Sequence, residues 1–402
     1  LSGDAGTHEL LDKQLAQSAI SLNPAAPQPL TPRLNPRRPA SHPASILPAI
    51  SQKAKSMSEE AASRPGSTLD EFNAYIQKAG LGHNRSAMKD NPGYVEDLAL
   101  AFYKWNEDPK TSPNLEIEDP DDYSFLMDCL DSPVAYEDEG VAVALLKVLK
   151  VLSRKVSNRE TMEISDVKII VKFVHRSHTT AICTEAASIC LNICYEKEVV
   201  GMMVQTRGVE ELTEMMSSYS EDVQANAAGA LQSLSYQEEG RVHMRELEVL
   251  KSLLPLLTHD NVKVRTRVVG VVHNMSSDIQ SIAVIREQKA IKTLVQMLTD
   301  PDVAICSSAA GAIQNISREA PSKVEISDVG GVPPLIDLMF GSDVQTQVCA
   351  TGALLNILGP KLECDPSTGV QMPHNVANRK ALSKLVMLSL VTGMAFHGMY
   401  TT

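Results

Sequence analysis

Aromatic side chains are scarce in this sequence. Phe, Tyr and Trp together make up 4% of its 402 residues, and Trp105 is the one tryptophan. Since 43% of the residues are hydrophobic, aliphatic and small side chains must build the core, and these pack at close range between stacked helices. A β-sandwich or barrel would normally contain more aromatic and β-branched alternation. The composition therefore favours an all-α fold.

The sequence also lacks a membrane-spanning run and the cysteine pattern of a disulfide framework. No run of 18 apolar residues occurs, so there is no ordinary membrane-spanning helix. The seven cysteines are odd in number, and five of them lie in apolar helical patterns, which indicates reduced, buried thiols in a cytoplasmic protein rather than a disulfide framework. The seven are Cys129, Cys183, Cys190, Cys194, Cys306, Cys349 and Cys364.

The formal net charge of −12 is unevenly distributed along the chain. An acidic protein repels the phosphate backbone, so we expect no nucleic-acid partner. Residues 13–57 contain six basic and no acidic residues, whereas residues 107–139 contain twelve acidic residues and one basic residue. A calcium loop in the acidic stretch would need oxygen ligands around a glycine. Pro120 and the absence of glycine favour a solvated loop and helix start instead.

Motifs that carry chemistry are also absent. The sequence contains no P-loop, GxSxG, HExxH or paired CxxC pattern, so we expect no catalytic residues, no cofactor and no small-molecule substrate. One cluster raises the question of zinc, but its spacing matches no standard ligand pattern, and cysteine is a common core residue. Core packing is the favoured interpretation, and no metal site is expected. The cluster consists of His175, His178, Cys183, Cys190 and Cys194.

The ends of the chain differ from its middle. Residues 1–66 are rich in Pro and Ser and basic, which predicts a disordered tail, although an organelle transit peptide stays open as an alternative. Residues 67–114 predict an N-terminal helical cap, in which a capping box at Thr68–Glu71 starts the first helix and residues 94–105 form the second. Residues 361–402 predict a loop and a C-terminal capping helix at 381–396.

Residues 115–360 repeat with a period of 41. A small residue followed four positions later by Asn or Ser recurs at this spacing, and so does an apolar position in the preceding helix. Such a period is typical of a solenoid, because one unit cannot bury all of its apolar faces and stacked units share a continuous core. Six three-helix units are predicted: 115–155, 156–196, 197–237, 238–278, 279–319 and 320–360. The clearest markers are Ser188/Asn192, Gly229/Ser233, Gly270/Asn274, Gly311/Asn315 and Gly352/Asn356.

Two stretches of these units resemble the armadillo repeat family. Residues 330–339, Gly-Gly-Val-Pro-Pro-Leu-Ile-Asp-Leu-Met, look like the second helix of that repeat, and residues 309–317, Ala-Ala-Gly-Ala-Ile-Gln-Asn-Ile-Ser, look like its third helix. The resemblance covers about 250 residues. It implies a right-handed superhelical solenoid and a scaffold or adaptor that binds other proteins in its concave groove, and it argues against an enzyme.

The family also implies where a partner binds. Its third helices line the groove, and their Asn side chains hydrogen-bond the backbone of an extended guest, since a carboxamide is both donor and acceptor. The resemblance therefore assigns Asn192, Asn274, Asn315 and Asn356 to the groove. Arg267 lies one helical repeat before Asn274, so we add it as a charged contact. The alternative is that each Asn ties its own helix to a neighbouring repeat, and both roles can coexist.

Nuclear import adaptors of this family carry Trp four residues before the Asn, in slots that hold basic side chains. The equivalent positions here are Gly or Ser, so cation–π slots cannot form. The pattern is more similar to the catenin and Vac8-like branch, which includes armadillo-repeats-only adaptors. Membrane attachment through an acylated N-terminus would need Met-Gly with nearby cysteines, which neither Leu1 nor Met57 offers. A nuclear import adaptor and an axonemal or cytoskeletal structural protein remain the alternative functions.

The glycines at this repeat position need a physical reason, because glycine within a helix costs about 1 kcal/mol relative to alanine. Either neighbouring long helices pack closely there, or a guest backbone passes over them. Close packing is the favoured interpretation.

Overall fold

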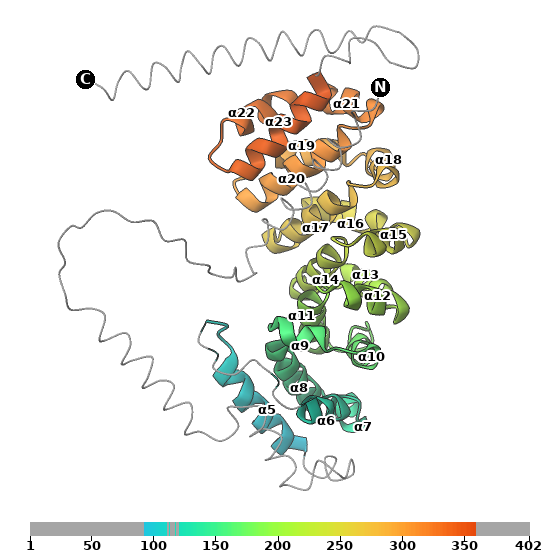
Figure 1. Cartoon of the computed structure of the whole chain (residues 1–402), viewed down its shortest axis with the longest axis vertical. Helices are drawn as coiled ribbons and strands as arrows, with labels where there is room; N and C mark the ends of the chain where they lie inside the picture. The colour runs from blue at the N-terminus through green and yellow to red at the C-terminus, as the bar shows by residue number, and fades with distance from the viewer. Residues whose placement is uncertain (1–91, 111, 113–116, 118–119, 359–402) are drawn as a thin grey trace, which may run out of the picture. The chain divides into compact units, whose positions relative to one another are not determined.

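The computed structural model describes residues 92–110, 112, 117 and 120–358. Every regular element within these residues is a helix, and none of these helices is long and apolar enough to cross a bilayer. The predicted tail at 1–66, the capping box at Thr68–Glu71 and the C-terminal helix at 381–396 lie outside the described residues. The solenoid architecture predicted from the 41-residue period is confirmed (Figure 1).

Seven long helices run through the described chain, and each packs against the next. The six that follow the first recur at the predicted period. The seven are α5 Pro92–Asn106, α8 Glu139–Leu152, α11 Thr180–Ile193, α14 Glu221–Leu234, α17 Val262–Met275, α20 Val303–Ile316 and α23 Val344–Leu358. Because α5 packs on α8 as α8 packs on α11, α5 occupies the place of a long helix ahead of the first unit.

Shorter helices fill the rest of each unit. The first helices are α9 Val156–Glu160, α12 Lys197–Gln205, α15 Glu238–Glu246, α18 Ile279–Glu287 and α21 Ala320–Asp328. The second helices are α6 Pro120–Leu130, α10 Ile164–Lys172, α13 Gly208–Glu214, α16 Val249–Leu253, α19 Ile291–Met297 and α22 Val332–Met339. The turns η1 Met215–Ser217 and η2 Leu254–Thr258 extend α13 and α16, and the short helix α7 Pro133–Glu137 precedes α8.

A column of capping residues starts the long helices. Residues 138, 179, 220, 261, 302 and 343 are Asp, Thr, Ser, Asn, Asp and Asp, and the side chain of each accepts a hydrogen bond from a backbone N–H of the turn that follows. Such residues satisfy N–H groups that a helix start leaves without partners, and each cap typically stabilises by about 1 kcal/mol. The caps therefore fix the register of every unit.

The turn between the first and second helices also recurs. Arg207, Glu248, Lys289 and Gly330 are 41 residues apart, and each has a positive φ, between 53° and 81°. Three of these left-handed positions are thus occupied by side chains that rarely adopt this conformation. The second helix of each unit begins one or two residues after this position, so the chain changes direction there within a very short turn.

One continuous apolar core runs along the stack. It contains Leu, Ile, Val, Ala and Met from all six units, with few aromatic members, such as Phe102 and Phe173. The composition predicted this core, because small side chains allow the close approach of neighbouring helices.

Candidate functional site

The candidate site is the surface formed by the long helices α11, α14, α17, α20 and α23, which we call the long-helix face. All five residues assigned to a partner from the sequence lie on these helices, and all five are half-buried. Half-buried polar side chains can contact both the neighbouring helix and a bound guest. The hydrogen bonds that they already form therefore determine which of their polar atoms can bind a guest.

Each of the four Asn side chains reaches back to the preceding unit. Its Nδ2 donates to a serine hydroxyl 39 residues earlier and to a backbone carbonyl 42 residues earlier. The hydroxyl bonds are Asn192 to Ser153 at 2.9 Å, Asn274 to Ser235 at 3.0 Å, Asn315 to Ser276 at 3.1 Å and Asn356 to Ser317 at 3.0 Å. The carbonyl bonds join them to Lys150, Gln232, His273 and Gln314, at 3.2 to 3.5 Å. We call each such contact an Asn rung.

In each Asn rung, the donor group of the carboxamide is used and its acceptor oxygen is not. Two acceptors engage the two N–H bonds of each Nδ2, whereas no described residue contacts any of the four Oδ1 atoms through a hydrogen bond. The inter-repeat tie left open by the sequence is therefore present. For a guest backbone, the side chains keep an acceptor.

The third unit lacks its rung. Ser233 stands where the second, fourth, fifth and sixth units have Asn, and Cys194 stands where the rungs have their partner serine. The Ser233 hydroxyl instead donates to the carbonyl of Gly229 in its own helix, at 3.2 Å. Both side chains are buried, and burial raises the pKa of the Cys194 thiol, so it stays protonated. The two differences are related, because an Asn at position 233 would lack the serine hydroxyl that accepts its hydrogen bond in the other rungs.

The recurrent glycines receive a side chain from the preceding unit. A Cβ placed on Gly270 or Gly352 would lie 2.2 or 2.3 Å from the Nε2 of Gln232 or Gln314, and one on Gly311 would lie 2.3 Å from the His273 ring. Close packing of neighbouring long helices, the favoured interpretation of these glycines, agrees with this geometry. Glycine leaves room for the side chain that crosses it, and a larger residue would force that side chain to move.

His273 is the aromatic member of this column. Its ring lies over Gly311, and burial lowers its pKa to about 4. The side chain is therefore neutral at pH 7. On α17, Arg265 and Arg267 therefore carry positive charge at this pH, whereas His273 does not.

The two arginines of α17 have different roles. The guanidinium of Arg265 donates to the carbonyls of His259 and Asp260, at 2.8 and 2.9 Å, and lies 3.9 Å from the carboxylate of Asp300. It thus stabilises the loop before α17. Arg267 donates to Oε1 of Gln232 at 3.2 Å, and no acidic side chain among the described residues pairs with it. Its charge is therefore uncompensated on the long-helix face.

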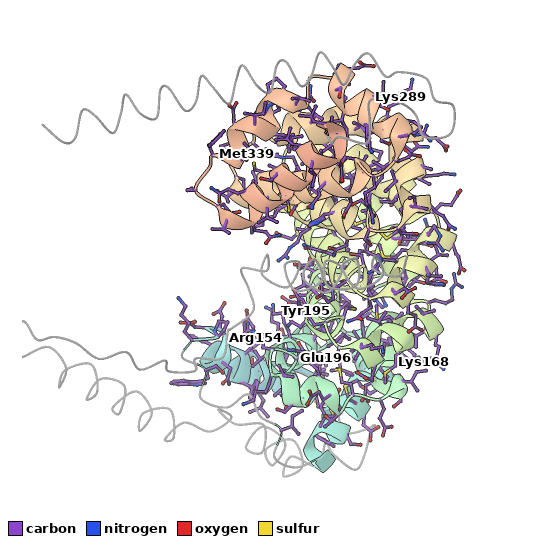
Figure 2. All side chains as sticks on the ribbon, turned by 45° about the horizontal axis from the view of Figure 1, so that its top comes forward. Arg154, Lys168, Tyr195, Glu196, Lys289 and Met339 are labelled. Atoms are coloured by element: carbon purple, nitrogen blue, oxygen red, sulfur yellow. The ribbon has the colours of Figure 1, made fainter. Side chains whose placement is uncertain are left out.

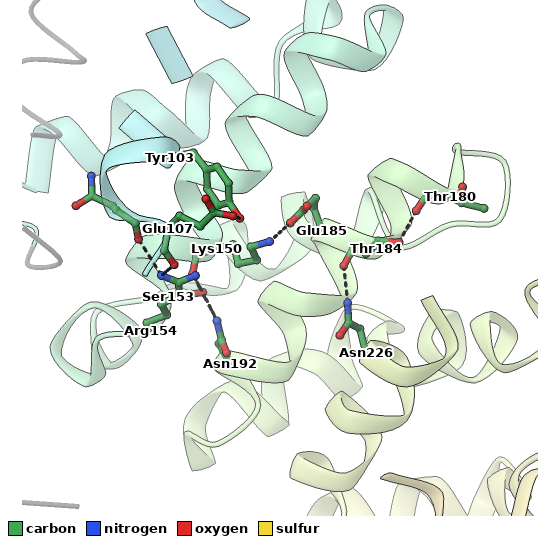
Figure 3. A network of polar contacts seen from close by, with 11 residues as sticks. Tyr103, Glu107, Lys150, Ser153, Arg154, Thr180, Thr184, Glu185, Asn192 and Asn226 are labelled. Carbon is green, nitrogen blue, oxygen red and sulfur yellow. Dashed lines mark hydrogen bonds and ion pairs between the residues drawn. The ribbon is translucent and has the colours of Figure 1, made fainter. Parts of the chain in front are cut away.

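The N-terminal end of this face is occupied by internal contacts (Figure 3). Lys150 forms an ion pair with Glu185, and Arg154 donates to the carbonyls of Asn106 and Glu107 at 3.0 Å each. Asn226, which is equivalent to Arg267 in the preceding unit, donates to the carbonyl of Thr184 at 3.1 Å. These polar groups of the first three units are therefore less available than Arg267.

A second column lies three residues after the Asn positions. Arg154 and Tyr195, both labelled in Figure 2, belong to it, and so do Tyr236, Ser277 and Arg318. Arg318 donates to the carbonyls of Ser276 and Ser277, at 3.1 and 2.6 Å, as Arg154 does at the end of α5. Arginines here close the C-terminus of the preceding long helix, where carbonyls lack partners.

The cysteine and histidine cluster of the second unit does not converge on a point. Cys190 and Cys194 are fully buried in the core, and burial raises the pKa of Cys190 to about 12. The Cys183 thiol donates to the carbonyl of His175 at 3.4 Å. In the described part of the chain, no group of three or more His, Cys, Asp or Glu residues is placed to hold a metal ion.

Sequence reasoning missed the column Gln232, His273 and Gln314. These residues directly precede the Asn or Ser marker, and each crosses the glycine of the next unit. The 41-residue spacing that identified the glycines was also the signal for this column.

Comparison with known proteins also identifies armadillo repeats in this chain. The Armadillo/beta-catenin-like repeat family model matches residues 278–318 and 320–359. An engineered protein solved by the Northeast Structural Genomics Consortium is 25% identical, with a TM-score of 0.54, over 62% of this chain and 98% of that chain. A second engineered protein from the consortium is 24% identical, with a TM-score of 0.62, over 76% and 73%.

The fold is also similar to a designed armadillo repeat protein in complex with the peptide (KR)4. That protein is 21% identical, with a TM-score of 0.52, over 58% of this chain and 98% of that chain. No curated protein is similar to this chain at a significant level.

Proposed function

This chain is an armadillo-repeat protein, and we propose that it is a scaffold that holds an extended segment of a partner protein on its long-helix face. The observation that carries the proposal is the row of Asn Oδ1 atoms, which follow the 41-residue period except at Ser233 and have no hydrogen-bond partner among the described residues. A guest in extended conformation presents backbone N–H groups at regular intervals, and these need acceptors.

The spacing of the elements supports an extended guest. Packed helices lie about 8–10 Å apart, and an extended chain advances about 3.3 Å per residue, so about two or three guest residues pass over each unit. The most regular part of the ladder comprises Asn274, Asn315 and Asn356, in the last three units. A designed armadillo repeat protein forms a complex with a peptide, which supports peptide binding by this fold in general.

Arg267 supplies the side-chain selectivity in this proposal. Its guanidinium has no ion-pair partner among the described residues, and arginine recognises carboxylates through two parallel hydrogen bonds. The guest is therefore an acidic segment where it crosses the fourth unit. The Trp positions of nuclear import adaptors hold Ser188, Gly229, Gly270, Gly311 and Gly352, which supports the catenin and Vac8-like branch in this proposal.

The scaffold acts without catalysis, membrane attachment or nucleic acid in this proposal. Six buried free thiols in the described residues favour a cytoplasmic location. Affinity purification with mass spectrometry identifies the natural partner, and fractionation checks the location.

The direct test uses extended acidic peptides selected by display against the full chain. Charge-assisted hydrogen bonds contribute about 1.5–3 kcal/mol, so Arg267→Ala should weaken the selected peptide roughly 10- to 150-fold by calorimetry. Arg265→Ala is the matched control, because that guanidinium lies two residues away on the same helix and is engaged by His259, Asp260 and Asp300. Equal weakening by the two variants, or none by Arg267→Ala, would overturn the assignment of Arg267.

A further inference from the structure

The first helices of neighbouring units are joined by ion pairs. At three junctions an arginine pairs with the acidic N-cap residue of the next first helix. Arg159 contacts Glu196 at 2.8 Å, Arg245 contacts Asp278, and Arg286 contacts Glu319 through two bonds of 2.9 and 3.3 Å. Glu196 is labelled in Figure 2. We call each of these contacts an Arg rung.

The junction between α12 and α15 lacks an Arg rung. Its N-cap residue is Gln237, at the position where the other junctions have Glu196, Asp278 and Glu319. Both positions that supply an arginine elsewhere are valine in α12, namely Val200 and Val204, which are 41 residues from Arg159 and Arg245. Neither partner of the ion pair is present, so the space between these two helices lacks the guanidinium found at the neighbouring junctions.

A pocket of about 630 Å³ lies at this junction. Val204 and Val242 give it an apolar wall, and Gln237 lines it together with the charged side chains around it. The two residues that replace the ion pair therefore both line the pocket. Its position indicates an arginine slot that this chain leaves unfilled.

The pocket has a negative rim. Glu238, Glu239 and Glu246 line it, against a single basic residue, Lys197. His243 also lines it and lies between two carboxylates, 3.7 Å from Glu246 and 3.7 Å from Glu210. Its Nε2 and the facing Oε2 of Glu210 are buried and have no hydrogen-bond partner among the described residues. The carboxylates of the rim and of Glu210 thus give this junction an excess of negative charge.

We propose that this pocket receives an arginine side chain from a partner protein, which completes the row of Arg rungs between the first helices. The methylene stem packs along Val204 and Val242, and the guanidinium donates to the carboxylates of the rim. Arginine fits better than lysine because its planar fork has five donors and is less strongly hydrated. The neighbouring junctions are the precedent, since Arg245 and Arg286 occupy the equivalent place. This site goes beyond the proposed function, because it lies on the first helices and not on the long-helix face.

The experiment follows the methyl groups of the valines by NMR in the full chain. The probe is acetyl-Gly-Gly-Arg-Gly-Gly-amide, and the comparison peptides replace Arg with Lys or with citrulline, its neutral near-isostere. We expect saturable shifts at Val204 and Val242 with the Arg peptide, and binding at least about tenfold tighter than that of the citrulline peptide, since charge-assisted hydrogen bonds are the stronger class. Equal binding of the Arg and citrulline peptides, or of the Arg and Lys peptides, would refute the assignment.

A second variant fills the slot from within. Val204→Arg/Gln237→Glu restores the residues of the other junctions, so its own guanidinium should occupy the pocket and weaken the Arg peptide at least about tenfold. The control is Val344→Arg/Gln296→Glu, which makes the same exchanges at two exposed positions outside the pocket and should bind like the wild type. Unchanged binding of the Arg peptide to the filled variant would refute the proposal. An acidic peptide held on the long-helix face should bind the filled variant normally, so the two sites fail independently.

Discussion

The side-chain amide of Asn315 donates a hydrogen bond to the hydroxyl of Ser276, 39 residues earlier in the chain, at 3.1 Å. The same nitrogen donates to the carbonyl of His273 at 3.3 Å. One side chain thus joins α20 to the end of α17. Because the same arrangement recurs in three other units, a residue that the family uses for its guests also holds this array together.

Asn315→Ala should therefore lower stability before any partner is added. The change removes two hydrogen bonds that contribute about 0.5–1.5 kcal/mol each, so we expect a loss of about 1–3 kcal/mol in the free energy of unfolding. Urea denaturation measures it. Gln280→Ala, at an exposed position of α18, is the control and should have little effect. If Asn315→Ala is as stable as the wild type, the rung is not structural.

Because the Asn side chains join neighbouring units, Asn variants are poor tests of partner binding. A double variant of Asn274 and Asn315 would lose inter-repeat bonds as well as contacts to a guest, so weaker binding alone would not separate the two roles. Arg267 is the cleaner probe, because it donates only to Gln232 among the described residues.

The sequence predicted the architecture well because each unit repeats the same physical constraints. The predicted fifth unit, 279–319, contains three helices, α18, α19 and α20, and the predicted sixth unit, 320–360, contains α21, α22 and α23. Apolar spacing and helix breakers are local signals, and six copies of them reinforce one another.

The partners of the site residues could not be predicted in the same way. The Asn-to-Ser contact depends on how far one long helix is offset against the next, which no local pattern encodes. The left-handed turns at Arg207, Glu248 and Lys289 carry no residue signal either, since only Gly330 is of the expected type. The open slot at Val204 has no signal of its own in the sequence, because it is defined by the ion pair of Arg245 with Asp278 at another junction.

His273 predicts a specific pH dependence. Its pKa is about 4 in the folded protein, against an ordinary value near 6.5, because burial disfavours the charged ring. Between these values the unfolded chain binds more protons, so stability is complete above about pH 6.5 and falls as the pH drops toward 4. The contribution has an upper limit of about 3 kcal/mol, at about 1.4 kcal/mol per pH unit.

The chain itself supplies the control for that prediction. His273→Gln introduces the residue found in the same column at positions 232 and 314. The variant should fold and should lose this part of the pH dependence in urea unfolding measured from pH 7 to pH 4. An unchanged slope in the variant would show that other groups cause the loss.

The left-handed turns allow a test in two directions. Lys289 has a φ of 58°, a conformation in which glycine is less strained, so Lys289→Gly should stabilise the protein by up to about 1 kcal/mol. Gly330 has a φ of 81° and open space around it, so Gly330→Ala should destabilise by about 1–2 kcal/mol through backbone strain alone. The midpoint temperature of thermal unfolding should rise for Lys289→Gly and fall for Gly330→Ala. A shift of the same sign in both variants would contradict this account.

The rung missing from the third unit can be rebuilt. Ser233→Asn combined with Cys194→Ser places at this junction the pair that joins the other units, and neither side chain has an inter-repeat hydrogen bond to lose, because the Ser233 hydroxyl donates within its own helix. We expect the double variant to gain about 1 kcal/mol in free energy of unfolding from the new hydrogen bonds. Ser233→Asn alone should be worse than the double variant, since its amide would face a buried thiol, a weak acceptor. The two changes should therefore be coupled, and a double-mutant cycle in urea should give a favourable interaction of at least about 0.5 kcal/mol. Strict additivity would mean that Asn and Ser do not pair at this junction, and that its helices have a different offset from those of the other units.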